Sequence, residues 1–285
     1  MLTCLLRAVT RPRPIHFLDM LRSLLTARGL RAAAAVLLAA APLTSCRSLN
    51  LIPLSQDPVL GAEAYPGLLE GESTITSGSE YAMVTRMTDR LVAAAKQRDP
   101  KIANLFEWEV KLVNRDDIVN AWCLPGGKMA VYTGILPVAE TETGLAVVMG
   151  HEIAHATLRH GTKKMTRQMG SALIVAVAAI AIGDDAGEKA IAAAVAGAGA
   201  AFANLAYGRR DEQEADAVGL EYMEMAGYDP REAVAFWTRM KEATGGGGGG
   251  GALLSTHPTN DARIAQIEEL LPNAIALYEQ SVGSN

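Results

Sequence analysis

Two histidines and a glutamate in this chain have the spacing that a catalytic metal site needs. His151, Glu152 and His155 form an HExxH pattern. Residues four apart share one face of a helix, so the two imidazoles can converge on one ion while the glutamate reaches water on the open coordination position. The apolar stretch 144–150 before them predicts that the helix starts in the protein interior. The pattern therefore predicts a zinc hydrolase site with Glu152 as general base.

A catalytic zinc needs a third protein ligand, and three later residues are candidates. His160 does not fit the HExxHxxGxxH spacing, because position 161 is glycine, and we interpret it as a helix-end residue. Glu212 and Asp216 are four residues apart, so one carboxylate can bind metal while the other accepts the free N–H of a ligating imidazole. The alternative for this pair is a solvated acidic face. His257 is the third candidate.

Three separated motifs follow one another along the chain, together with a fourth segment between residues 120 and 127. They are Gly150-His151-Glu152-Ile153-Ala154-His155, then Arg209-x-x-Glu212-x-Glu214-Ala215-Asp216, then Thr256-His257-Pro258 with Arg263 beyond it; the fourth segment is Asn120-Ala121-Trp122-x-Leu124-Pro125-Gly126-Gly127. In this order they resemble the Ste-twenty-four/HtpX class of zinc metallopeptidases. That class includes CAAX prenyl proteases, a mitochondrial inner-membrane quality-control protease and periplasmic proteases that act in the quality control of outer-membrane protein assembly. The resemblance covers residues 79–271, and its departure at Gly208, where the class usually has serine, leaves the metal motif intact.

The resemblance implies a fold and a role for each site residue. It implies an α+β, mostly helical, gluzincin-like zincin domain with a small β-sheet beside the HExxH helix. It also implies a metalloendopeptidase with one zinc ion per chain, held by His151, His155 and Glu212, with Asp216 as the helical neighbour that orients a ligand. In relatives, the histidine that corresponds to His257 approaches the zinc in a closed state or meets the substrate in an open one. The alternative is a loop-capping histidine.

Hydrophobic periodicity and the positions of proline and glycine predict the elements that carry these residues. Residues 79–98 have an apolar stripe at helical spacing, and later helices are expected from Pro230 to Met240 and over residues 260–271. Strands are expected at 107–112, 118–124 and 128–133, the last two around the Pro125-Gly126-Gly127 turn. By resemblance, we place the edge that binds peptide substrates by β-addition within residues 118–133. Seven glycines, residues 245–251, precede His257 and predict a flexible segment that lets this histidine move.

Two apolar stretches, residues 171–182 and 190–207, lie between the metal motifs. The first has 12 residues, fewer than the roughly 20 that a bilayer requires, and the second is rich in alanine and glycine. We therefore expect two packed helices near the active site that touch lipid at most, rather than a transmembrane hairpin.

The amino-terminal residues have the pattern of an export signal. Residues 1–45 carry six arginines and one acid, and end in a short apolar run followed by Leu43-Thr44-Ser45-Cys46, which is similar to a bacterial lipobox. We predict a lipoprotein signal peptide over residues 1–45, a tether over 46–77 and the peptidase domain over 78–285. Acylated Cys46 is then the attachment to the bilayer, and Arg47 after it favours the outer membrane, facing the periplasm. An ordinary signal peptide and a start at Met20 are the alternatives.

Composition excludes some functions. The 285-residue chain has 26 basic and 31 acidic residues; without the leader, 20 basic and 30 acidic residues remain, a net charge of −10. Such a surface argues against nucleic-acid binding. After the leader and Cys46, the remaining cysteine is Cys123, so no internal disulfide is expected, and its place in a predicted strand favours burial over nucleophilic catalysis.

These observations predict a zinc-dependent endopeptidase that hydrolyses misfolded or unassembled cell-envelope proteins. We assign Glu152, Asp216 and His257 to catalysis, and His257 or Arg263 is the candidate for stabilising the oxyanion. The alternative is an envelope assembly factor or chaperone on a metallopeptidase scaffold with minor proteolysis. A purely structural zinc is disfavoured because Glu152 then has no purpose.

Overall fold

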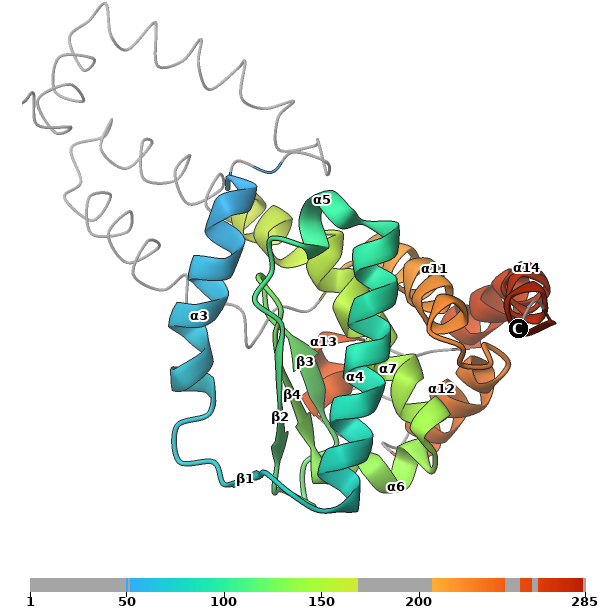
Figure 1. Cartoon of the computed structure of the whole chain (residues 1–285), viewed down its shortest axis with the longest axis horizontal. Coiled ribbons are helices and arrows are strands. Elements are labelled where there is room, and N and C mark those ends of the chain that lie inside the picture. Colours follow the sequence, from blue (N-terminus) through green and yellow to red (C-terminus); the bar gives the residue numbers. More distant parts are fainter. Residues whose placement is uncertain (1–49, 51, 169–206, 244–251, 258–260, 284–285) are drawn as a thin grey trace, which may run out of the picture. The chain divides into compact units, whose positions relative to one another are not determined.

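A computed structural model describes residue 50 and residues 52–168, 207–243, 252–257 and 261–283 of the chain (Figure 1). The predicted leader, Cys46, the two apolar stretches up to residue 206 and the glycine run lie outside the described residues. Among the helices in the described part, none combines the length and apolar character that crossing a bilayer requires.

A four-stranded mixed sheet forms one layer of the domain. Its strands lie in the order β1-β2-β4-β3, with β2 and β4 parallel and the other two pairs antiparallel. Gly126 and Gly127, in the turn that joins β3 to β4, have φ angles of 81° and 90°, which favour glycine. The three predicted strands are confirmed: one is shifted to later residues, two are shorter than expected, and a fourth strand, β1, was not predicted. The strands are β1 (Thr74–Ile75), β2 (Glu109–Val113), β3 (Ala121–Cys123) and β4 (Lys128–Tyr132).

Helices cover both faces of this sheet because its strand residues alternate between two apolar clusters. One face, with Leu112 and Met129, packs with the main core beneath α4 (Ser79–Arg98) and α7 (Glu142–Thr157). The opposite face faces α3 (Asp57–Leu68), whose Tyr65 hydroxyl donates to the Met129 carbonyl at 2.8 Å. Figure 1 shows the sheet between α3 on one side and α4 and α7 on the other.

Residues 54–75 differ from the irregular tether that the sequence predicted. They form η2 (Leu54–Gln56), α3 and β1. The glycines and prolines of this segment suggested irregular backbone, but Pro58 lies in the first turn of α3, where a missing N–H costs nothing. A Cβ on Gly61 would lie 1.9 Å from the Pro125 carbonyl oxygen, so glycine is what lets α3 approach the β3–β4 turn.

Two helices that cross closely carry the metal motifs. The Thr141 side chain caps the start of α7 by accepting the Gly144 N–H at 3.0 Å, and α7 is buried from Gly144 to Thr157. Helix α11 (Arg209–Met225) packs along it, and the two backbones meet where Gly150 faces Gly219. Small residues at this crossing bring the carboxylates of α11 to the histidines of α7.

The carboxy-terminal helices complete the core, with α14 packed on α11 and α12 packed on α7. Helix α14 (Asp261–Gly283) extends beyond the predicted end at residue 271 and contains Pro272. Ile267 and Ala274, on either side of that proline, are both buried, and this burial outweighs one lost backbone hydrogen bond. The other described helices are α5 (Pro100–Ala103), η3 (Thr133–Ile135), α6 (Leu136–Ala139), α12 (Glu232–Ala243) and α13 (Ala252–Thr256), and residues 160–168 are also helical.

Candidate metal centre

Four side chains from three parts of the chain bring nitrogen and oxygen atoms to one point. One such atom from each of His151, His155, Glu212 and His257 lies within 4.8 Å of the others, and all four side chains are buried. The Nε2 atoms of His151 and His155 are 3.0 Å apart, and the Glu212 carboxylate oxygens lie 3.5 Å and 3.4 Å from them. The predicted HExxH and Glu212 residues are therefore brought together.

His257 enters the same group from the end of α13. Its Nδ1 lies 3.0 Å from Oε1 of Glu212 and 3.1 Å from Nε2 of His151. Its Nε2 lies 3.2 Å from Oε1 of Glu152, so the ring stands between the carboxylate on α7 and the carboxylate on α11. In this structure His257 is a fourth member of the donor group, not a loop-capping side chain.

Glu152 is buried beside these rings. Burial raises the pKa of its carboxyl, while the neighbouring His257 and His151 rings oppose that shift. Its Oε1 has no well-oriented hydrogen-bond donor among the described residues. A carboxyl with a raised pKa and an unsatisfied oxygen next to a metal-type donor group suits a general base.

Asp216 holds His151 from behind the donor group. Its Oδ1 lies 2.9 Å from Nδ1 of His151, and both of its oxygens accept hydrogen bonds of 2.8 Å from Arg263. Although its burial acts the other way, Arg263 and His151 lower the pKa of Asp216 to about 2. Burial and Arg263 likewise oppose protonation of His151, but Asp216 raises the pKa of that ring to about 9. Asp216 thus lies where a carboxylate orients a ligating imidazole.

Arg263, on α14, pairs with the carboxylates of Glu212 and Asp216 on α11. Its Nη1 lies 2.9 Å from Oε2 of Glu212, and its guanidinium stacks on the Trp237 ring at 3.9 Å. Burial acts to raise the pKa of Glu212, but His257 and Arg263 hold it far below its usual value. Arg263 thus contacts both carboxylates, and its Nη2 also lies 3.3 Å from Nε2 of His151.

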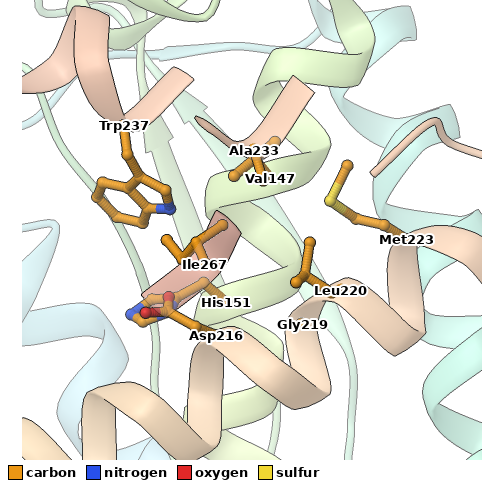
Figure 2. Close-up of a pocket in the computed structure, with 9 residues that line it drawn as sticks. All are labelled: Val147, His151, Asp216, Gly219, Leu220, Met223, Ala233, Trp237 and Ile267. Carbon is orange, nitrogen blue, oxygen red and sulfur yellow. The ribbon is translucent and has the colours of Figure 1, made fainter. Parts of the chain in front are cut away.

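A small cavity lies behind His151, and Figure 2 shows His151 and Asp216 on one side of it with Trp237 and aliphatic side chains around the rest. Its volume of about 10 Å³ leaves room for one water at most. The Trp237 ring also meets the His151 ring edge-on, with 5.5 Å between centroids. The surroundings of His151 are therefore nearly dry, which strengthens its interaction with Asp216.

His160 has a role at the site that the sequence did not indicate. It begins the helix after α7, it is fully buried, and its Nδ1 lies 3.0 Å from Nδ1 of His155. Its Nε2 lies 3.4 Å from a Glu214 oxygen. Burial lowers the pKa of His160 to about 4, so the ring is neutral and can accept the His155 N–H. The sequence predicts a helix-end residue here, and His160 is the first residue of the helix that follows α7. Its contact with His155 could not be inferred from spacing, because a two-residue turn separates the two helices.

Two further residues lie near the donor group, and Tyr207 was not connected with it from the sequence. The Tyr207 ring stacks on His155 with 4.0 Å between centroids, and burial raises the pKa of its hydroxyl. Cys123, as predicted, is a buried free thiol in β3, and burial raises its pKa well above the usual value. A thiol with that pKa is not a nucleophile at neutral pH.

The donor set fits zinc. Imidazole nitrogens and a carboxylate oxygen are the ligands of catalytic zinc sites, and the Asp216 and His160 contacts are the kind of support that ligating histidines have. The sequence model of peptidase family M48 matches residues 79–271, which include every residue of the group.

The chain belongs to peptidase family M48. It is 34% identical over 245 residues to the mitochondrial metalloendopeptidase OMA1 of Schizosaccharomyces pombe, covering 84% of this chain and 68% of that protein. It is 32% identical over 199 residues to the Saccharomyces cerevisiae protein of the same name, covering 67% and 56%. It is 31% identical over 233 residues to a putative beta-barrel assembly-enhancing protease of Vibrio cholerae, covering 77% and 45%.

These similarities confirm the predicted family, the zincin-like fold and the zinc. They make the chain a zinc metalloendopeptidase whose substrates are proteins or peptides. The chain spans about two thirds of the fission-yeast relative and roughly half of the other two.

Proposed function

We propose that this metalloendopeptidase hydrolyses peptide bonds of misfolded or unassembled proteins of the cell envelope. His151, His155 and Glu212 hold one zinc ion, and Glu152 is the general base. The observation that carries the assignment is the buried convergence of these donors from two helices, with the Glu152 carboxylate beside them.

His151, His155 and Glu212 would hold the zinc ion, which would supply a Lewis acid for the scissile carbonyl and for the attacking water. Glu152 accepts the proton from that water and passes it to the leaving amine. Asp216 accepts the Nδ1–H of His151 and keeps its Nε2 directed at the metal position. Arg263 holds Asp216 and Glu212 in their relative positions.

His257 and β3 are the parts that meet the substrate in this proposal. The His257 ring contacts both Glu152 and Glu212, which supports a closed state that a substrate has to open. After opening, the same ring is available to an oxyanion. Strand β3 lies at an edge of the sheet and next to α7, which suits a peptide that adds to it by main-chain hydrogen bonds.

The envelope assignment rests on the leader and on the relatives' names. We propose that residues 1–45 are a lipoprotein signal peptide, that Cys46 carries the lipid, and that residues 78–285 form the peptidase domain facing the periplasm from the outer membrane. The name of the Vibrio cholerae relative supports a role in β-barrel assembly, whereas the two yeast names are mitochondrial.

A second candidate is an assembly factor in which cleavage is a minor activity. The contact between His257 and Glu152 favours this candidate, because a chain in the closed state can bind unfolded proteins without cleaving them.

The variant Glu152→Gln tests the proposal. It removes the base but keeps the three metal ligands, so zinc should remain at one per chain while cleavage of a denatured protein falls by roughly 10²- to 10⁴-fold. Glu221→Gln is the matched control: it makes the same chemical change on α11, where Glu221 pairs with Arg98 away from the metal group. Unchanged cleavage by Glu152→Gln would refute the assignment.

The same variant separates the two candidates. If full-length Glu152→Gln traps envelope proteins in extracts but does not replace the wild type in a deletion strain, proteolysis is the main activity. If it replaces the wild type fully, binding is the main activity.

A further inference from the structure

A buried ion pair joins the amino-terminal segment to the turn that follows the HExxH helix. Asp57, at the start of α3, is fully buried. Both of its oxygens accept hydrogen bonds of 2.8 Å from the Arg159 guanidinium, which also donates to the Ile52 carbonyl at 2.7 Å. This bidentate pair is the strong form of an Arg–carboxylate contact. It connects residues about 100 positions apart in the chain.

The Arg159 backbone makes the turn depend on that pair. Arg159 has a φ of 60°, which residues with a Cβ rarely adopt. Such a conformation persists only where the surroundings hold it. Here α7 ends at Thr157, the chain turns through Leu158 and Arg159, and the next helix begins at His160.

The turn determines where the His160 ring lies. Arg159 interrupts the helical backbone between Thr157 and His160, and the His160 ring places its Nδ1 3.0 Å from Nδ1 of His155. A His160 that continued α7 as a regular helix would lie on a different face, since five residues are about 500° of rotation. The contact with His155 therefore depends on the conformation of Arg159.

More contacts of the same segment hold the helix that His160 begins. The Asn50 side chain donates to Thr162 at 2.8 Å and accepts from Thr166 at 3.2 Å. Tyr65 of α3 packs in one apolar cluster with Met165 of that helix. We call residues 50 and 52–68 the strap. All of it lies before residue 79, where the family match begins.

We propose that the strap is a positioning element of the metal centre: through the Asp57–Arg159 pair it fixes the turn that seats His160 against His155. Asp57 and Arg159 are positioning residues, and neither touches the metal position. His160 accepts the Nδ1–H of His155 and keeps Nε2 of that ring directed at the metal. The inference rests on the proposed function in one respect, the assignment of His155 as a zinc ligand.

The test measures zinc affinity of the full-length chain by competition with a chelator, beside thermal unfolding. Asp57→Asn keeps the size of the side chain but removes its charge, and Arg159→Gly removes the guanidinium while permitting the same backbone conformation. Each should weaken zinc binding by about 10- to 100-fold, the range for residues that support metal ligands. Glu232→Gln is the control, because it breaks a comparable bond to Arg239 away from the metal group. Zinc affinity should stay within twofold there.

A zinc affinity within twofold of wild type in Asp57→Asn, even with a lowered unfolding temperature, would overturn the proposal. The route through His160 is tested by His160→Gln alone and combined with Asp57→Asn. If the strap acts through His160, the double variant binds zinc about as tightly as His160→Gln; losses that multiply would overturn this route. Cobalt substitution adds a spectroscopic readout, since a displaced His155 changes the visible absorption of bound Co²⁺.

His155→Ala separates this proposal from the proposed function. If that variant binds zinc as tightly as the wild type, the ligand assignment fails, whatever the strap does. If it loses zinc while Asp57→Asn keeps wild-type affinity, the ligand assignment stands and the strap proposal fails.

Discussion

Nε2 of His257 lies 3.2 Å from Oε1 of Glu152, so the proposed general base is in contact with a ring that follows α13, far from it in the sequence. The same ring is 3.0 Å from Glu212. The His257 ring thus occupies space beside the Glu152 carboxylate, where an attacking water would meet the base. Removing it should change catalysis more than metal binding.

The variant His257→Ala should retain one zinc per chain and cleave an unfolded protein several-fold faster than the wild type, because His151, His155 and Glu212 remain and the base is uncovered. Initial rates at equal zinc content measure this, with Glu152→Gln/His257→Ala as the inactive control. A rate that instead falls tenfold or more would mean that His257 mainly stabilises the oxyanion.

The variant Glu212→Ala should lose zinc. Its carboxylate is the one anionic donor in the group. Its removal also takes away one of the two carboxylates that pair with Arg263 and leaves only Asp216 for that guanidinium. We expect zinc affinity to fall by at least about 100-fold and the unfolding temperature to stop responding to added zinc. Glu221→Ala, on the same helix but paired with Arg98, should bind zinc normally. Full zinc content in Glu212→Ala would contradict the ligand assignment.

The variant Gly219→Ala should separate the two metal-binding helices. A Cβ at Gly219 would lie 2.9 Å from the His151 backbone nitrogen, so α11 has to move away from α7. Such overpacking typically costs about 1–3 kcal/mol of unfolding free energy. We expect a lower unfolding temperature and weaker zinc binding together. Gly283→Ala is the control, because a Cβ there, at the end of α14, meets nothing within 4 Å, and it should leave both quantities unchanged.

Glu224 should make the stability of the fold depend on pH. Burial raises the pKa of its carboxyl to about 7, with Glu221 adding to the shift. A carboxyl with a higher pKa in the folded state binds its proton more tightly there than in the unfolded state, so protonation stabilises the fold. The free energy of unfolding should therefore fall as pH rises from about 4.5 through about 7. We expect this contribution to be on the order of 1 kcal/mol.

The variant Glu224→Gln stays neutral and should abolish that part of the pH dependence. Urea unfolding of the wild type and variant at pH 5 and pH 8 measures it. The variant should be the more stable protein at pH 8 and close to the wild type at pH 5. Parallel pH dependence of the two proteins would show that Glu224 is charged and solvated in the fold.

The sequence by itself determined the family and the zinc, because its separated motifs resemble those of the family, and it determined the main elements through local spacing. Four-residue spacing placed His151 with His155 and Glu212 with Asp216 on their helices whatever packs around them. Alternation and the Pro125-Gly126-Gly127 turn likewise predicted the β3–β4 hairpin.

Only the tertiary structure decided which remote residues support that site. The sequence of residues 54–75 suggested a tether because prolines and glycines interrupt it, yet α3 forms there by packing on the sheet. His160 faces His155 only because Arg159 turns the chain with φ of 60°, and Asp57 holds that turn from another segment. Such contacts join residues far apart in sequence. They stabilise the protein only after the core has brought the segments together, so no local sequence pattern predicts them.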